Sequence, residues 1–163
     1  MANPYRGHIP ADPNAAHSRG AGAIRAHWRR LTELAFSEAL RRDPTLRDRY
    51  DEHALRVFYR DYEGHFEQLA LALAAGTDEA VIRYGEWLTP LLRRRRVPTD
   101  DFLTFVAAMA SVVRTVLTPA EDEAAQGIVD RWTARQRKAK RIAGDRKRNP
   151  VLAFFWKGVG IAD

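Results

Sequence analysis

An uninterrupted apolar stripe between Glu52 and Ala75 is the feature that most constrains the fold of this chain. Its large apolar residues follow one another at intervals of three or four positions: Leu55, Phe58, Tyr62, Phe66, Leu69 and Leu73. This spacing places all six side chains on one face of an α-helix, and that face must be covered by other parts of the chain. Gly76 is the expected end of the helix, because glycine readily adopts the left-handed conformation found at helix C-termini.

The same periodicity predicts further helices over residues 24–40, 78–96, 99–116 and 118–143, and a short helix that begins at Asp43-Pro44. Thr99 is the expected cap of the third of these segments. Thr118-Pro119-Ala120-Glu121 has the pattern of a capping box with proline at the first helical position, which marks the start of the last helix. The positions expected to face the core are Ile24, Trp28, Leu31, Leu34/Ala35, Leu40, Val81, Tyr84/Gly85, Leu88, Leu91/Leu92, Phe102, Val106, Met109, Val113, Val116, Ala125, Ile128, Val129 and Trp132.

The two ends of the chain differ from this helical body. Residues 1–23 contain three prolines and several glycines and serines, which predicts an extended N-terminal arm. Residues 149–163 form an apolar C-terminal segment in which Val151 to Trp156 could be read as a strand, but this strand would have no partner. We therefore predict an all-α protein with one helical domain over residues 24–148 between these two segments.

Composition restricts the class of protein. The 163 residues fit one domain of ordinary size, which needs neither a metal nor a disulfide to hold its core. The absence of cysteine excludes thiolate catalysis and Cys-ligated zinc and suits a reducing compartment. The first six residues contain no apolar run of the kind found in secretory signals. The apolar run from Phe102 to Val113 is too short to cross a bilayer. We therefore expect a cytoplasmic protein with no secretory signal and no membrane span.

The formal net charge of +6 comes largely from two basic clusters, Arg93–Arg96 and Arg135–Arg148. Both clusters fall at predicted helix C-termini, where cations complement the helix dipole. Neither is accompanied by a nucleic-acid recognition motif or by interleaved stacking aromatics. We therefore interpret them as solvated helix ends and expect no nucleic-acid partner.

The histidines argue against common cofactor and metal sites. A haem globin needs a proximal histidine on the helix after the long one, and the segment 78–96 contains none. A di-iron bundle needs Glu-x-x-His pairs on two helices, which are also missing. Asp61 and His65 could form half of a metal site, but their spacing favours a local hydrogen-bonded pair on the helix flank. We find no catalytic set and expect neither an enzyme nor a metal protein.

The segment from Phe58 to Phe66 (Phe-Tyr-Arg-Asp-Tyr-Glu-Gly-His-Phe), with the run that ends in Ala75-Gly76, resembles the chromophore helix of the phycobiliprotein branch of the globin superfamily. In that family the helix carries Cys-x-Arg-Asp, then aromatic residues, and ends in Ala-Gly before an acidic residue. Tyr84, Gly85 and Glu86 continue the likeness, which covers residues 52–130.

The resemblance implies an all-α, globin-like domain of the phycobiliprotein type. The chain is similar to the cysteine-free, bilin biosynthesis-associated globins of non-photosynthetic bacteria. Phe58 occupies the family's cysteine position, so no bilin should be linked covalently there. The helices before the match are also shorter than in light-harvesting members, so the resemblance does not imply their ring assembly.

The function implied by the resemblance is non-enzymatic and concerns bilins, which are linear tetrapyrroles. Asp61 would accept hydrogen bonds from pyrrole N–H groups, and Arg60 would pair with a propionate. The other implied contacts of a non-covalent bilin are Phe58, Tyr62, His65, Tyr84 and Trp87. Enzymes of bilin biosynthesis are the implied partners, and no haem is expected. Without the resemblance, Arg60 and Asp61 would be ordinary exposed helix residues.

Two other functions fit the same residues. One is a helical sensor, regulatory or scaffold module that acts through a dimer and a protein partner without a cofactor. The other is a cap-like four-helix bundle of the kind found in cobalamin proteins.

Phe154, Phe155 and Trp156 would form an apolar patch if they were exposed, and soluble monomers usually avoid such patches. We therefore expect these aromatic residues to lie at an interface and the chain to form a homodimer.

Overall fold

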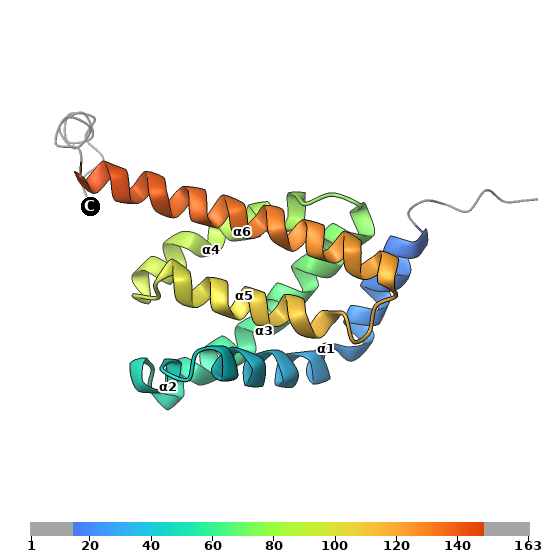
Figure 1. Cartoon of the computed structure of the whole chain (residues 1–163), viewed down its shortest axis with the longest axis horizontal. Coiled ribbons are helices and arrows are strands. Elements are labelled where there is room, and N and C mark those ends of the chain that lie inside the picture. The colour runs from blue at the N-terminus through green and yellow to red at the C-terminus, as the bar shows by residue number, and fades with distance from the viewer. Residues whose placement is uncertain (1–14, 149–163) are drawn as a thin grey trace, which may run out of the picture.

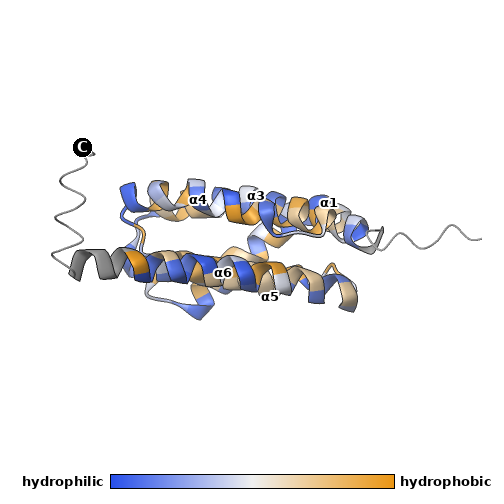
Figure 2. Cartoon of the chain, turned by 90° about the horizontal axis from the view of Figure 1, so that it is seen from above, coloured by the Kyte–Doolittle hydropathy of each residue, from blue (hydrophilic) through white to orange (hydrophobic). Residues whose placement is uncertain are grey.

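The structure is a computed structural model that describes residues 15–148, with side chains described between residues 17 and 142. These residues form six helices: α1 (Ala15–Arg42), α2 (Leu46–Arg49), α3 (Glu52–Ala75), α4 (Glu79–Arg94), α5 (Thr99–Val113) and α6 (Pro119–Arg148). No strand occurs within this range, which confirms the all-α prediction. Seen from above, α1, α3 and α4 lie in one layer, and α5 and α6 lie in a second (Figure 2).

Helix α3 runs diagonally behind α5 and α6 (Figure 1) and contacts α1, α4, α5 and α6. The predicted stripe is buried in these contacts: Tyr62, Phe66, Leu69 and Leu73 are almost inaccessible, Phe58 is buried, and Leu55 is partly buried. Each large side chain that is fully removed from water contributes roughly 1.5–3 kcal/mol. The burial of this one face therefore accounts for much of the driving force that assembles the other helices around α3.

Helix α1 begins earlier than the sequence predicts. Residues 15–23 are helical and not extended, so this part of the N-terminal arm prediction is wrong; residues 1–14 lie outside the described residues. Ala21 is buried beside Ile24, and a Cβ on Gly20 would lie 2.9 Å from Leu73 of α3. The small residues that suggested a loose arm instead allow close packing of α1 on α3.

Most predicted helix boundaries agree with the structure. Gly76 ends α3 in the left-handed conformation (φ 66°). The capping box is confirmed, because the Thr118 N–H donates to the Glu121 carboxylate at 2.8 Å and the Glu121 N–H donates to the Thr118 hydroxyl at 3.4 Å. The prediction that Thr99 caps α5 is wrong, since Thr99 is its first helical residue and Pro98 precedes it.

The last two helices also differ in length from their predictions. Helix α5 ends at Val113, three residues before the predicted end, while α6 continues past residue 143 to Arg148. Trp132 and its predicted core neighbours on α6 are buried as expected. The expected interface residues Phe154, Phe155 and Trp156 lie outside the described residues.

Two glycines provide a matched test of this packing. A Cβ on Gly85 of α4 would lie 2.7 Å from the indole nitrogen of Trp132 and 2.3 Å from the side-chain nitrogen of Gln136, both on α6. Gly85→Ala should therefore lower the free energy of unfolding by about 1–3 kcal/mol through overpacking. Gly22→Ala on α1 should raise it by roughly 0.5–1 kcal/mol, because no atom lies within 4 Å of that Cβ position. Urea unfolding measures both, and equal stability of the two variants would contradict this packing.

Candidate ligand cleft

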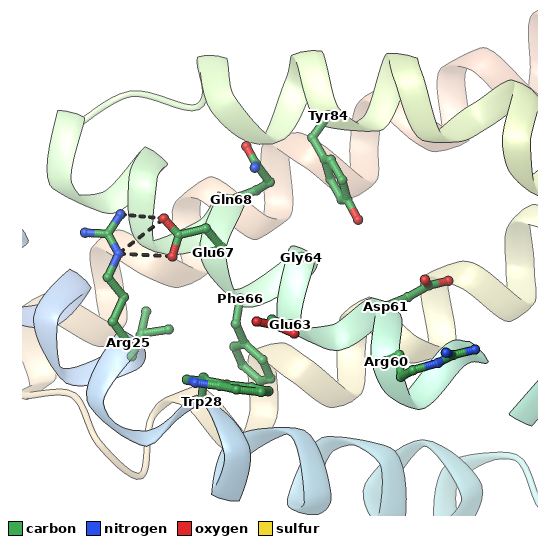
Figure 3. Close-up of a pocket in the computed structure, with 11 residues that line it drawn as sticks. Arg25, Trp28, Arg60, Asp61, Glu63, Gly64, Phe66, Glu67, Gln68 and Tyr84 are labelled. Carbon is green, nitrogen blue, oxygen red and sulfur yellow. Dashed lines mark hydrogen bonds and ion pairs between the residues drawn. The ribbon is translucent and has the colours of Figure 1, made fainter. Parts of the chain in front are cut away.

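A surface cleft of about 650 Å³ lies on the outer side of α3, between α1 and α4. Figure 3 shows the side chains that surround it. Helix α1 contributes Ile24, Arg25 and Trp28, α4 contributes Tyr84, and α3 contributes Arg60, Asp61, Glu63, Gly64, Phe66, Glu67 and Gln68. Residues that are distant in the sequence therefore form one site, because α1 and α4 both pack against the middle of α3.

The floor of the cleft is apolar and tightly packed. Ile24 and Phe66 are almost completely buried, and the partly buried Trp28 lies beside Phe66 (Figure 3). Gly64 leaves room for Tyr84 to lie over α3, since a Cβ on Gly64 would be only 3.0 Å from the Tyr84 hydroxyl oxygen. The cleft thus has two aromatic faces, one supplied by α1 and one by α4.

The charged groups around the cleft differ in how far they are neutralised. Arg25 donates to Glu67 through two nitrogens, with distances of 2.7 and 3.0 Å, and this hydrogen bonding lowers the pKa of Glu67. Asp61 forms an ion pair with Arg95 at 2.9 Å. Arg60 is exposed and has no carboxylate partner among the described side chains. The Arg60 guanidinium is therefore available to an anionic group in the cleft.

Asp61 lies at a boundary between the cleft and the protein interior. Burial raises the pKa of this carboxyl group, and the neighbouring Arg95 opposes that effect. Only Oδ2 of Asp61 takes part in the bond to Arg95. The carboxylate therefore keeps lone pairs with which it can accept hydrogen bonds from a ligand.

Directly beneath the cleft, His65 joins α3 to α4 inside the core. Its Nδ1 lies 3.0 Å from the Tyr84 hydroxyl, and its ring makes edge contacts with Tyr62, Phe102 and Trp132. Burial lowers the pKa of His65 to about 4. The imidazole is therefore neutral at physiological pH. Nearby, the buried indole nitrogen of Trp132 has no hydrogen-bond partner.

The interior between α3, α4 and α5 contains almost no free space. The cavity there has a volume of about 10 Å³, and its lining includes Phe58, His65, Leu88, Phe102 and Phe105. Aromatic rings fill this region, with centroid distances of 4.8 Å between Phe58 and Phe105 and 5.7 Å between Phe102 and Trp132. This interior cavity is therefore too small for a ligand the size of a tetrapyrrole, whereas the outer cleft of about 650 Å³ is not.

The structure divides the predicted ligand-binding residues into three groups. Arg60, Asp61 and Tyr84 line the cleft together. Phe58, Tyr62 and His65 belong to the core, where the Tyr62 hydroxyl donates to the Phe105 carbonyl at 3.0 Å. Trp87 lies outside the cleft lining, is 62% exposed, and stacks on Tyr84 with a centroid distance of 5.7 Å.

The predicted hydrogen bond between Asp61 and His65 is wrong. Helix α4 and the turn that follows it supply better partners, because Arg95 reaches Asp61 and Tyr84 reaches His65. Sequence reasoning also missed Arg25 and Glu67 as site residues. They are 42 positions apart, so no local spacing could reveal their contact.

A comparison with protein-family models and with characterised proteins finds no match to this sequence. Within the described residues, no three His, Asp or Glu side chains are grouped to hold a metal ion. In the same part of the chain, every helix is too short or too polar to cross a membrane.

Acidification tests the environment assigned to His65. The pKa of this group falls from 6.5 to about 4 on folding, so the unfolded chain binds a proton in this range that the folded chain does not. The free energy of unfolding should therefore be highest above the pKa of the unfolded chain, which is 6.5. It should decrease by up to about 3 kcal/mol as the pH falls towards the pKa of the folded chain. Urea unfolding between about pH 7.5 and 5 measures the loss.

His65→Gln should be less stable than the wild type near neutral pH but should lose less stability on acidification. His53→Gln, which changes an exposed histidine on the same helix, is the matched control and should follow the wild type. Identical pH profiles for wild type and His65→Gln would show that His65 is not buried in the neutral form.

Proposed function

We propose that this chain is a globin-like, non-enzymatic protein of the phycobiliprotein type that binds a bilin without a covalent bond. The observation that carries the proposal is the convergence of Arg60, Asp61 and Tyr84 on one cleft. The resemblance implied all three residues as ligand contacts. A role in bilin biosynthesis, with its enzymes as partners, belongs to the same proposal.

The arrangement of helices supports the fold part of the proposal. Globins pack crossed helices in pairs around one pocket. Here α1 packs on α3 and α5, α5 packs on α6, and α4 contacts both α3 and α6. The long helix α3 ends at Ala75, and Gly76 leads into α4, as the resemblance implies for a chromophore helix.

The chemistry of the cleft supports the ligand class. Its volume of about 650 Å³ lies in the range of roughly 300–1,000 Å³ that is usual for small-molecule sites. Arg60 could pair with a propionate, the free lone pairs of Asp61 could accept pyrrole N–H groups, and the rings of Trp28 and Tyr84 offer flat apolar contacts. The open shape of the cleft implies a ligand that remains partly in contact with solvent.

Haem binding is not part of this proposal, because α4 contains no histidine and the interior volume is about 10 Å³. Haemin added to the protein should give no Soret band that survives gel filtration. A surviving band that shifts on substitution of His65 would contradict the proposal.

A titration with biliverdin tests the site. Wild-type protein should red-shift and sharpen the absorption of the bilin on binding. Arg60→Ala should weaken affinity by roughly 1–3 kcal/mol, since a charged hydrogen-bond partner is lost. Asp61→Asn should move the absorption maximum to the blue, because the anionic acceptor of the pyrrole N–H groups is removed. Absorption spectroscopy gives the position of the absorption maximum, and quenching of tryptophan fluorescence gives the affinity.

Arg56→Ala is the matched control for these variants. Arg56 lies one turn before Arg60 on α3, is exposed, and pairs with Glu52 at 3.2 Å outside the cleft. This variant should bind biliverdin as the wild type does. Equal affinities and spectra for all four proteins would reject the cleft as the bilin site.

A second function, a regulatory module that acts through protein partners without a cofactor, is favoured by one observation. Trp87 exposes 62% of its surface on α4, although tryptophan is among the residues most often found at the centre of protein interfaces. This second function would be supported if the wild-type chain bound no bilin and the Trp87→Ala variant lost binding to a protein partner.

A further inference from the structure

A second hollow lies between α4 and α6, apart from the cleft described above. It has a volume of about 600 Å³. The residues that line it include Glu86 and Thr89 of α4 and Arg135, Lys138, Arg141 and Ile142 of α6. We call it the α4/α6 groove. None of its lining residues contributes to the cleft between α1, α3 and α4.

The floor of the groove is polar and well ordered by hydrogen bonds. Gln136 is only 6% exposed, and its side-chain oxygen lies 3.2 Å from the Thr89 hydroxyl. The same hydroxyl donates to the Gly85 carbonyl at 2.7 Å. The Thr89–Gln136 contact joins α4 to α6, whereas the Thr89–Gly85 bond lies within α4.

Positive charge in the groove exceeds negative charge. Glu86 is the only carboxylate among the described residues that line it, and it accepts a hydrogen bond from Arg135 at 2.8 Å. Lys138 and Arg141 have no carboxylate within ion-pair distance among the described side chains. Elsewhere on α6, Arg131 pairs with Asp78 at 3.0 Å and Lys140 pairs with Asp100 at 2.6 Å. Among the described side chains, Lys138 and Arg141 are therefore basic residues of α6 in the groove without an ion-pair partner.

An apolar wall accompanies these cations. Ile142 is 45% exposed, and Ala139 lies partly buried one turn before it on the groove side. A site with only charged residues would suit any polyanion. A combination of two available cations and an exposed isoleucine suits a ligand that carries both acidic and aliphatic groups.

We propose that the α4/α6 groove binds an acidic, amphipathic peptide segment of a partner protein. Lys138 and Arg141 are three positions apart on one helix face, a spacing of roughly 5–6 Å between their Cβ atoms. Alternate residues of an extended peptide lie at a similar separation, so two of its carboxylates reach both cations. The next residue on this same face of the peptide is aliphatic and covers Ile142. None of the described residues that line the groove is aromatic, so they offer no ring on which a nucleic-acid base could stack, which favours the peptide over nucleic acid.

The test uses the whole chain and a fluorescent glutamate–leucine peptide, in which two glutamates and then a leucine occupy successive alternate positions separated by serines. Anisotropy is measured near physiological salt. Lys138→Glu and Arg141→Glu should each weaken binding by about tenfold or more. Arg137→Glu is the control with the same change in net charge, because Arg137 is exposed on α6 outside the groove. This control should change the affinity by less than about threefold, because Arg137 does not line the groove and its charge acts on the peptide only through screening solvent.

Ile142→Ser separates the apolar contact from the charges. It should weaken the glutamate–leucine peptide while leaving a glutamate–serine peptide unchanged. Circular dichroism checks that each variant keeps the wild-type helix content. Biliverdin titrations of Lys138→Glu should match the wild type, so failure of the groove and failure of the cleft can be distinguished.

Three results would overturn the proposal. The first is no peptide binding by the wild type. The second is equal weakening by Arg137→Glu and Lys138→Glu, which would indicate diffuse attraction and no defined site. The third is tighter binding of a single-stranded oligonucleotide than of the peptide, which would assign the groove to nucleic acid.

Discussion

The burial of one face of α3 is the interaction on which the other helices depend. Tyr62 lies at the centre of this face, and its hydroxyl approaches the Ala35 carbonyl of α1 at 3.2 Å and the Phe105 carbonyl of α5 at 3.0 Å. The single hydroxyl proton of Tyr62 is thus shared between carbonyl groups of two neighbouring helices, while its ring is removed from water. Burial raises the pKa of this phenol far above its usual range, as expected for a hydroxyl that stays protonated in the core.

The same packing determines where a ligand can bind. Helices α1 and α4 are both held against the middle of α3, and the cleft lies between them on its outer side. The inner side of α3 is filled by His65, Phe102 and Trp132, which leaves about 10 Å³ of free volume. A core that is filled in this way stabilises the fold without any bound group. The cleft therefore depends on the packing of α1 and α4 against α3 for its shape.

The sequence predicts the helices and most of the core because both follow from short-range periodicity. The stripe from Phe58 to Leu73, the glycine at the end of α3 and the capping box at Thr118 are local signals, and each is confirmed. The start of α1 could not be predicted in this way, since Gly20 and Ala21 owe their place in a helix to contacts with distant residues.

The site was predictable only at Arg60 and Asp61 of α3 and at Tyr84 of α4. Arg60 and Asp61 were recognised on one helix, but the roles of Arg25 and Arg95 depend on contacts across 42 and 34 positions. Periodicity contains no information about such contacts. It also cannot distinguish Arg60, which lines a cleft, from Arg56, which lies one turn away and pairs with Glu52.

We propose that a bilin binds in the outer cleft of α3. The most direct test is to record backbone amide NMR spectra of isotopically labelled protein during a titration with biliverdin. Chemical-shift changes should be largest for residues 24–28, 60–68 and 84, which surround the cleft, and small along α6. Shifts that are absent at saturating biliverdin, or that are centred on the interior residues Phe102 and Trp132, would contradict the claim.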